Sequence, residues 1–183
     1  MNSEVQKAVY LDRDGTIIEH VHYINDPNKV KLISHAGEGL RLMREKGYLL
    51  YVISNQSGVA RGLIDDEQFK AVHEKFCDFL KQEGVEIAEF CYCFHHPDDK
   101  GSCRKPNTGL VAKEFNDKPI DLSQSVMVGD NKSDLQLAHN FGGKAYLVRT
   151  GDGEQTLTKL EKEDWREPYE IADNLLEIAK ALP

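Results

Sequence analysis

Residues 8–16, AVYLDRDGT, join an apolar run directly to two aspartates and a glycine. The apolar part, residues 8–11, is typical of a buried strand, and Asp12 follows at the point where that strand should end. Gly15 has no side chain and can form a tight turn after Asp14. Two carboxylates this close repel each other unless a cation lies between them, and Mg²⁺ prefers such hard oxygen ligands. We therefore predict a magnesium site at the end of this strand.

Apolar runs and helix-like stretches alternate along the 183 residues, with no internal repeat or linker between them. This alternation predicts an α/β fold, a doubly wound Rossmann-like parallel sheet with helices on both faces, in a single domain spanning 1–183. The expected strands are 8–11, 48–53, 87–94, 125–128 and 145–148. The expected helices are 38–46, 66–83, 108–115, 133–140 and 168–181.

The chain is acidic, with 23 Lys and Arg against 31 Asp and Glu and a net charge of −8. Nucleic acid is a polyanion, so an acidic chain without a basic cluster is a poor match for it. No apolar run approaches the roughly 20 residues of a membrane-spanning helix, and residues 1–12 lack a basic stretch followed by an apolar one. We therefore expect a cytoplasmic monomer that binds a small molecule and neither nucleic acid nor membrane.

Polar side chains follow three of the expected strands, at the edge where open α/β sheets bind their ligands. They are Asp12 and Asp14 after the first strand, Ser54 and Asn55 after the second, and Asp130 and Asp134 after the fourth. Because parallel strands end at one edge of the sheet, we expect these groups to share one crevice. Asp134 has a second interpretation, as a salt-bridge partner on a helix face.

Four sequence blocks, LDRDGT, ISNQSG, CRKPNTG and VGDNKSD, lie in this order between residues 9 and 134. Together they resemble the haloacid dehalogenase (HAD) superfamily of phosphatases. Within it, HHPDD followed by CRKP is most similar to the heptose bisphosphate phosphatases, with the histidinol-phosphate phosphatases as close relatives. The resemblance implies Mg²⁺-dependent hydrolysis of a small sugar phosphate through an aspartyl-phosphate intermediate. The implied substrate is D-glycero-D-manno-heptose 1,7-bisphosphate, a lipopolysaccharide precursor, with histidinol phosphate as the alternative.

The resemblance also implies roles for four catalytic residues. Asp12 would be the nucleophile, and Asp14 would protonate the leaving oxygen and later activate the hydrolytic water. Ser54 would donate a hydrogen bond to the phosphoryl oxygens, and Lys105 would supply positive charge to them.

Further residues are expected to bind the metal and the substrate, again by resemblance. The expected Mg²⁺ ligands are Asp12, Asp14 through its backbone carbonyl, Asp130 and Asn131. The expected substrate-binding residues are Glu19, His22, Asn55, Gln56, Ser57 and Arg104. The predicted site thus draws on segments from four parts of the chain.

Cysteines cluster in residues 91–106, beside two histidines. In a reducing compartment such clustering favours a metal or plain thiols over a disulfide. Related phosphatases often carry a zinc held by a Cys-x-His and a Cys-x-Cys pair, which Cys93, His95 and Cys103 match in part. Gly101 stands where the remaining cysteine would be, and structural zinc sites are almost always four-coordinate. The resemblance therefore leaves zinc open.

Three other residues could replace the missing zinc ligand. Cys91 would face the same side as Cys93 and His95 if the strand continued through His95. His96 and Asp98 are other replacements. The alternative for Cys91 is an ordinary buried thiol on an apolar strand.

The intervals between the blocks are too short for a cap domain, which predicts an essentially capless phosphatase with an open cleft. A function of another class, a non-catalytic phosphate-binding module, is compatible with the same fold. Asp14 favours the enzyme, because a binding module needs no acid–base group two residues after Asp12.

Overall fold

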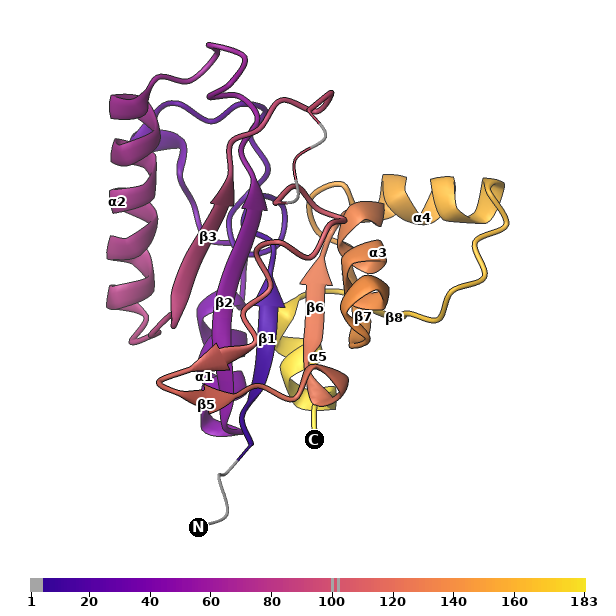
Figure 1. Cartoon of the computed structure of the whole chain (residues 1–183). Coiled ribbons are helices and arrows are strands. Elements are labelled where there is room, and N and C mark those ends of the chain that lie inside the picture. The colour runs from indigo at the N-terminus through magenta and orange to yellow at the C-terminus, as the bar shows by residue number, and fades with distance from the viewer. Residues whose placement is uncertain (1–4, 100, 102) are drawn as a thin grey trace.

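The computed structural model describes residues 5–99, 101 and 103–183, and a parallel β-sheet lies at its centre (Figure 1). Within these ranges six strands pair in one sheet, all of them parallel to their neighbours. Their order across the sheet is β3 (Glu89–Cys93), β2 (Tyr48–Asn55), β1 (Lys7–Leu11), β6 (Val126–Gly129), β7 (Lys144–Val148) and β8 (Glu170–Ala172). The predicted doubly wound α/β fold is confirmed.

Strand β1 lies in the middle of the sheet, and the strand order reverses once along the chain. The chain adds β2 and β3 on one side and then returns to pair β6 with the other side of β1. Leu11 pairs with Val128, so the residues that follow β1 and β6 emerge next to each other. Ligands of open α/β sheets bind where the strand order reverses.

Helices cover both faces of this sheet. On one face the apolar core includes side chains of α1 (Ala36–Glu45), α2 (Asp66–Gln82) and α5 (Leu175–Ala181). On the other it includes side chains of α3 (Lys132–Phe141) and α4 (Gly153–Lys162). Burial from both sides explains why β2 is a continuous apolar run. Among the helices of the described chain, none is both long and apolar enough to cross a membrane.

The start of α2 shows how local sequence sets a helix boundary. Asp65 Oδ1 accepts a hydrogen bond from the backbone N of Gln68 at 2.8 Å, and Gln68 Oε1 accepts one from the Asp65 backbone N at 3.0 Å. This reciprocal capping satisfies two backbone donors that the helix leaves free. The prediction of a helix over 66–83 is confirmed to within one residue.

The prediction of a helix over 108–115 is wrong. That segment is a loop that leads into a short antiparallel hairpin, β4 (Glu114–Phe115) and β5 (Lys118–Pro119). The turn residues Asn116 and Asp117 have φ values of 51° and 58°. Asn and Asp tolerate this left-handed conformation, which suits tight hairpin turns.

The C-terminal region also differs from the prediction. Helix α4 was not predicted, and the expected helix over 168–181 begins only at Leu175, since residues 170–172 join the sheet edge as β8. Asn174 Oδ1 accepts hydrogen bonds from the backbone N atoms of Leu176 and Glu177 and so starts α5.

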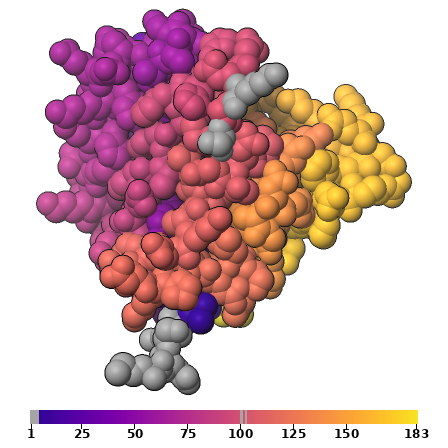
Figure 2. Space-filling view, viewed as in Figure 1, coloured from indigo at the N-terminus to yellow at the C-terminus, as the bar shows by residue number. Residues whose placement is uncertain are grey.

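The segments from β1 to α1 and from β3 to β6 are built of loops, the 3₁₀ turns η1 (Pro27–Lys29) and η2 (Leu122–Gln124), and the β4–β5 hairpin. In the parts of the chain that are described, no separate cap unit is inserted into either segment. The segment between β3 and β6 covers the middle of the face seen in Figure 2. The capless prediction agrees with this arrangement.

Candidate active site

A cavity of about 370 Å³ opens at the carboxyl ends of the strands, where β1 and β6 end side by side. Most of the predicted site residues line it: Asp12, Asp14, His22, Ser54, Asn55, Gln56, Ser57, Arg104, Lys105, Asp130 and Asn131. Glu19 is exposed and does not line this cavity. The structure thus brings together nearly all the groups that the sequence singled out.

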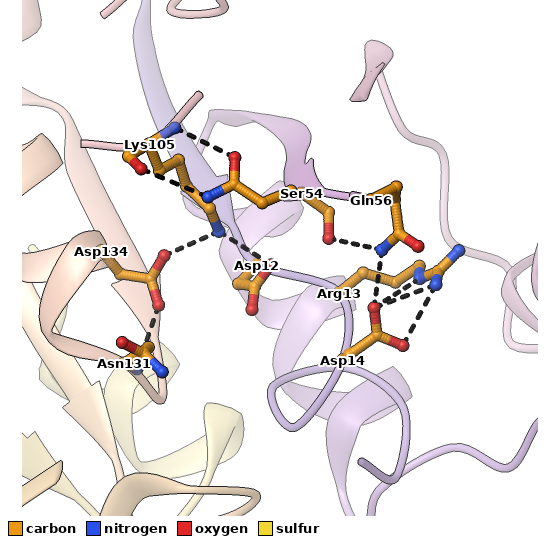
Figure 3. Close-up of polar contacts among 9 residues, drawn as sticks. Asp12, Arg13, Asp14, Ser54, Gln56, Lys105, Asn131 and Asp134 are labelled. Carbon is orange, nitrogen blue, oxygen red and sulfur yellow. Dashed lines mark hydrogen bonds and ion pairs between the residues drawn. The ribbon is translucent and has the colours of Figure 1, made fainter. Parts of the chain in front are cut away.

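Lys105 is buried between two carboxylates at the floor of the cavity (Figure 3). Its Nζ lies 2.8 Å from Asp12 Oδ1 and 2.7 Å from Asp134 Oδ1. Burial lowers the pKa of Lys105, but the charges of Asp12 and Asp134 raise it more, so that the net shift is upward. The lysine therefore stays charged, and Asp134 belongs to the site and not to an exposed helix face.

Asp130 adds a third buried carboxylate, and carboxylate oxygens of Asp12, Asp130 and Asp134 lie within 4.8 Å of one another. Burial raises the pKa of Asp130, and the negative charges of Asp12 and Asp134 raise it further. Burial also raises the pKa of Asp134, against the opposing charge of Lys105. Three carboxylates against one lysine favour an added cation, and their oxygen atoms are the donors that Mg²⁺ prefers.

Two glycines allow Asp130 to sit where it does. Asp130 Oδ2 accepts a hydrogen bond from the backbone N of Asp152 at 2.7 Å. A Cβ on Gly15 would lie 2.0 Å from this oxygen, and one on Gly151 would lie 2.1 Å from it. Both glycines also have positive φ. Any side chain here would displace the carboxylate, so the loops after β1 and β7 determine where Asp130 lies.

Asp14 faces the cavity and is held by two neighbours (Figure 3). Gln56 Nε2 donates to Asp14 Oδ2 at 2.8 Å and to Ser54 Oγ at 2.9 Å. Arg13 Nε and Nη2 donate to the same carboxylate at 3.1 Å and 2.9 Å. The sequence analysis did not assign Arg13 to the site.

Asn55, which the sequence analysis assigned to substrate, lines the cavity and also binds the backbone of Lys105. Its Oδ1 accepts from the backbone N of Lys105 at 3.0 Å, and its Nδ2 donates to the backbone O of Lys105 at 3.3 Å. This reciprocal pair fixes the loop that carries the lysine to the end of β2.

The mouth of the cavity contains residues that the sequence analysis did not identify. They include Tyr23, Ile64, Ser133 and Asp152. His20, which belongs to the predicted substrate stretch 19–22, lines the cavity as well. His20 Nδ1 lies 3.3 Å from Asp152 Oδ2. Arg104 is half-buried here, and burial together with the charge of Arg61 lowers its pKa. No spacing rule marks these loop residues, because they meet only in the folded chain.

Residues 91–106, the cysteine loop, were expected to hold a metal or free thiols and no disulfide. That expectation is corrected, because the structure joins Cys93 and Cys103 by a disulfide. Their Cα atoms are 5.6 Å apart, within the range that a disulfide spans. His95 Nδ1 lies 3.3 Å from Cys103 Sγ, and the three side chains form a group of convergent metal donors. A Cβ on Gly101 would lie 2.1 Å from His95 Nδ1, so the missing fourth ligand would have faced the same point.

Cys91 is not part of this group, which contradicts its assignment as a compensating ligand. The strand ends at Cys93, so it does not carry His95 onto the same side. Two residues of strand place Cys91 about 7 Å further down the sheet. There it packs against the apolar core of the α3 face, and burial raises its pKa to about 11.

Comparisons with known proteins agree with this geometry. A family model described as HAD-hydrolase-like matches residues 102–178. The D-glycero-beta-D-manno-heptose-1,7-bisphosphate 7-phosphatase of Haemophilus ducreyi is 41% identical over 157 residues, 80% of this chain and 85% of the relative. The D-glycero-alpha-D-manno-heptose-1,7-bisphosphate 7-phosphatase of Photorhabdus laumondii is 33% identical over 79% of this chain and 84% of the relative.

A solved structure with the same fold is that of D,D-heptose 1,7-bisphosphate phosphatase from B. bronchiseptica, complexed with magnesium and phosphate. It matches with a TM-score of 0.86 and 30% identity, over 97% of this chain and 98% of that chain. Magnesium in that relative is consistent with the carboxylate cluster found here. The chain is therefore a phosphatase of the HAD-like hydrolases and belongs to the family of D-glycero-D-manno-heptose-1,7-bisphosphate 7-phosphatases.

Proposed function

We propose that the chain, as one phosphatase domain, hydrolyses the 7-phosphate of D-glycero-D-manno-heptose 1,7-bisphosphate with the help of Mg²⁺. The observation that carries the proposal is the buried group of Asp12, Asp130, Asp134 and Lys105, with Asp14 beside it, at one end of a cavity. The names of the relatives supply the substrate. Both anomers occur among those names, so the anomer preferred here is a matter for experiment.

In the first chemical step, a carboxylate oxygen of Asp12 attacks phosphorus and the bond from phosphorus to the sugar oxygen breaks. Asp14 donates a proton to that oxygen as it leaves. The products are the sugar alcohol and an aspartyl phosphate on Asp12. In the second step, Asp14 takes a proton from water, which attacks phosphorus, releases phosphate and restores the Asp12 carboxylate.

The remaining polar groups stabilise the negative charge that this transfer concentrates on phosphoryl oxygens. The Lys105 ammonium and the Ser54 hydroxyl are the donors placed for this role. A Mg²⁺ ion bound by Asp12, Asp130 and the backbone carbonyl of Asp14, with Asn131 nearby, would supply further positive charge to the phosphoryl group. His22, Ser57 and Arg104 also line the cavity and would contact the sugar.

The direct test is phosphate release from both anomers of heptose 1,7-bisphosphate and from histidinol phosphate, with and without Mg²⁺. We expect Mg²⁺-dependent hydrolysis with kcat/KM highest for a heptose bisphosphate, and none in Asp12→Asn. A preference for histidinol phosphate would reject the substrate. Equal, negligible rates for wild type and Asp12→Asn on all three esters would reject the enzymatic function and favour a binding module.

We also propose that the reduced cysteine loop binds zinc weakly. When reduced, Cys93, His95 and Cys103 offer zinc three donors and leave the position at Gly101 without one. Since structural zinc sites are almost always closed by four ligands, we expect zinc to bind this loop more weakly than a complete site.

A further inference from the structure

Arg13 stands between the two proposed catalytic aspartates in the sequence, and its buried guanidinium lies against Asp14. Its side chain is only 1% exposed, and its Nη1 has no hydrogen-bond partner among the described residues. Burying a charge is costly unless it is paired. A buried guanidinium at this point therefore calls for an explanation beyond packing.

The partner of this guanidinium is Asp14, the proposed proton donor. Arg13 Nη2 donates to Asp14 Oδ2 at 2.9 Å and to Oδ1 at 3.1 Å, and Nε donates to Oδ2 at 3.1 Å. Both carboxylate oxygens are thus engaged by one planar group, which fixes the rotation of the carboxylate. Gln56 adds a bond to Oδ2 from the side of Ser54.

The Arg13 guanidinium also lies over the ring of Tyr92 on β3, and Tyr92 in turn contacts α2. The guanidinium lies 5.7 Å from the centre of the Tyr92 ring. The Tyr92 hydroxyl lies 3.0 Å from Nδ1 of His73 on α2. Aromatic faces attract guanidinium groups, so Tyr92 limits how far Arg13 can move away from Asp14.

The backbone around Arg13 is fixed independently of its side chain. The Arg13 carbonyl accepts hydrogen bonds from the backbone N atoms of Ile17 at 3.0 Å and Ile18 at 3.1 Å. A side-chain substitution leaves these bonds available. The loop after β1 can therefore persist while the Asp14 carboxylate loses its clamp.

We propose that Arg13 is a positioning residue, which holds the Asp14 carboxylate in the orientation from which it protonates the leaving oxygen. The inference rests on the proposed function of Asp14 and adds a residue to it. Arg13 acts through Asp14, and its loss should therefore matter most when the leaving oxygen needs a proton.

This dependence on the leaving group gives a test that a purely structural role would fail. The alkoxide that leaves an alkyl phosphate is strongly basic, so it needs a proton as it departs. The phenolate that leaves p-nitrophenyl phosphate is weakly basic and can depart without one. The ratio kcat/KM reports only the steps up to formation of the aspartyl phosphate, so it isolates this proton transfer. General acid catalysis typically contributes about 10²–10⁴-fold.

The experiment measures kcat/KM of wild type, Arg13→Met and Arg13→Lys on a series of monoesters from alkyl to p-nitrophenyl phosphate. We expect Arg13→Met to lose about 100-fold on alkyl esters and less than about tenfold on p-nitrophenyl phosphate. Arg13→Lys keeps the charge without the planar fork, so its loss on alkyl esters should be intermediate. Arg41→Met, which removes an arginine paired with Glu83 on the surface, should leave both rates unchanged.

Equal losses on all esters, or no loss on any, would overturn the inference. If Arg13→Met does not fold, Gln56→Met removes the other donor to Asp14 and should give the same pattern with a smaller amplitude. Wild-type activity on simple monoesters but not on heptose bisphosphate would reject the proposed substrate and leave this test in force. Absence of all wild-type phosphatase activity would reject both proposals.

Discussion

Two groups of side chains in this structure could hold a metal ion, and they differ in how completely they are built. The acidic cluster, Asp12, Asp130 and Asp134, is buried, and each carboxylate has a hydrogen-bond or ion-pair partner. The cysteine loop group, Cys93, His95 and Cys103, has a glycine at the fourth position and a disulfide between its sulfurs.

The difference shows which parts of the molecule the proposed chemistry needs. The acidic cluster contains the proposed nucleophile, Asp12, and the carboxylates packed beside it, so a missing member should remove function. The cysteine loop only leads to Lys105, whose backbone is already bound on both sides by Asn55. We therefore expect the activity to depend strongly on the first group and weakly on the second.

The largest expected effect follows loss of the nucleophile. Asp12→Asn should lower kcat/KM by about 10⁴-fold or more, because no other group can form the aspartyl phosphate. The matched change in the other group, Cys103→Ser, should lower it by less than about tenfold. Steady-state kinetics on heptose bisphosphate measure both, and a larger loss in Cys103→Ser would reverse the comparison.

Lys105→Met should have the next largest effect. Removing a preorganised charge from a phosphoryl site typically costs about 10²–10³-fold in kcat. The substitution also leaves Asp12 and Asp134 without their shared partner. Rapid-mixing kinetics should show slower phosphoryl transfer, and an unchanged kcat would remove Lys105 from the mechanism.

Gly151→Ala should weaken Mg²⁺ binding about tenfold, because its Cβ would lie 2.1 Å from Asp130 Oδ2. Gly62→Ala is the matched control, since Gly62 also has positive φ but nothing lies within 4 Å of its Cβ position. Both alanines are strained by positive φ, so the difference in calorimetric Mg²⁺ affinity reports the contacts of the Gly151 Cβ, which are Asp130 Oδ2 and the Gly15 backbone. Equal affinities in the two variants would contradict the proposed role of Asp130.

Mg²⁺ should stabilise the protein more at high pH than at low pH. The raised pKa values of Asp130 and Asp134 mean that the folded state keeps protons that the unfolded state releases. Their contribution to stability therefore falls as pH rises above about 4, and Mg²⁺ binds the deprotonated form and offsets the loss. The increase in Tm on adding Mg²⁺ should grow with pH in wild type and be small in Asp130→Asn. A pH-independent increase would argue against Asp130 as a Mg²⁺ ligand.

The smallest effect on activity is expected from completing the cysteine loop. Gly101→Cys, studied under reducing conditions, should raise zinc affinity at least about tenfold, because a fourth donor closes the site. Activity should change less than about threefold. Competition with a zinc chelator measures the affinity, and equal affinity in wild type and variant would show that the glycine position does not limit binding.

The sequence predicted the fold and the acidic cluster because both depend on local patterns. Buried strands appear as apolar runs, and a residue directly after such a strand lies at the ligand-binding edge, as Asp12 and Asp130 do. Strand β8 was missed because only three residues, at an exposed edge, form it. Short polar-flanked strands carry little periodic signal.

Other parts of the site depend on contacts that no local pattern records. The contact of Asn55 with the backbone of Lys105 could not be predicted, because the two residues are 50 positions apart in the sequence. Arg13 was missed because no sequence pattern shows that its side chain binds the carboxylate of its neighbour Asp14. The disulfide between Cys93 and Cys103 was not predicted, because no local sequence pattern shows that the chain brings these two residues together.

The most direct test of the aspartyl-phosphate mechanism is acid quenching of the enzyme during turnover of a ³²P-labelled heptose bisphosphate. We expect wild-type protein to retain label that hydroxylamine releases, as an acyl phosphate requires, and Asp12→Asn to retain none. Turnover by the wild type without protein-bound label, or equal labelling of Asp12→Asn, would contradict a mechanism in which Asp12 is the nucleophile.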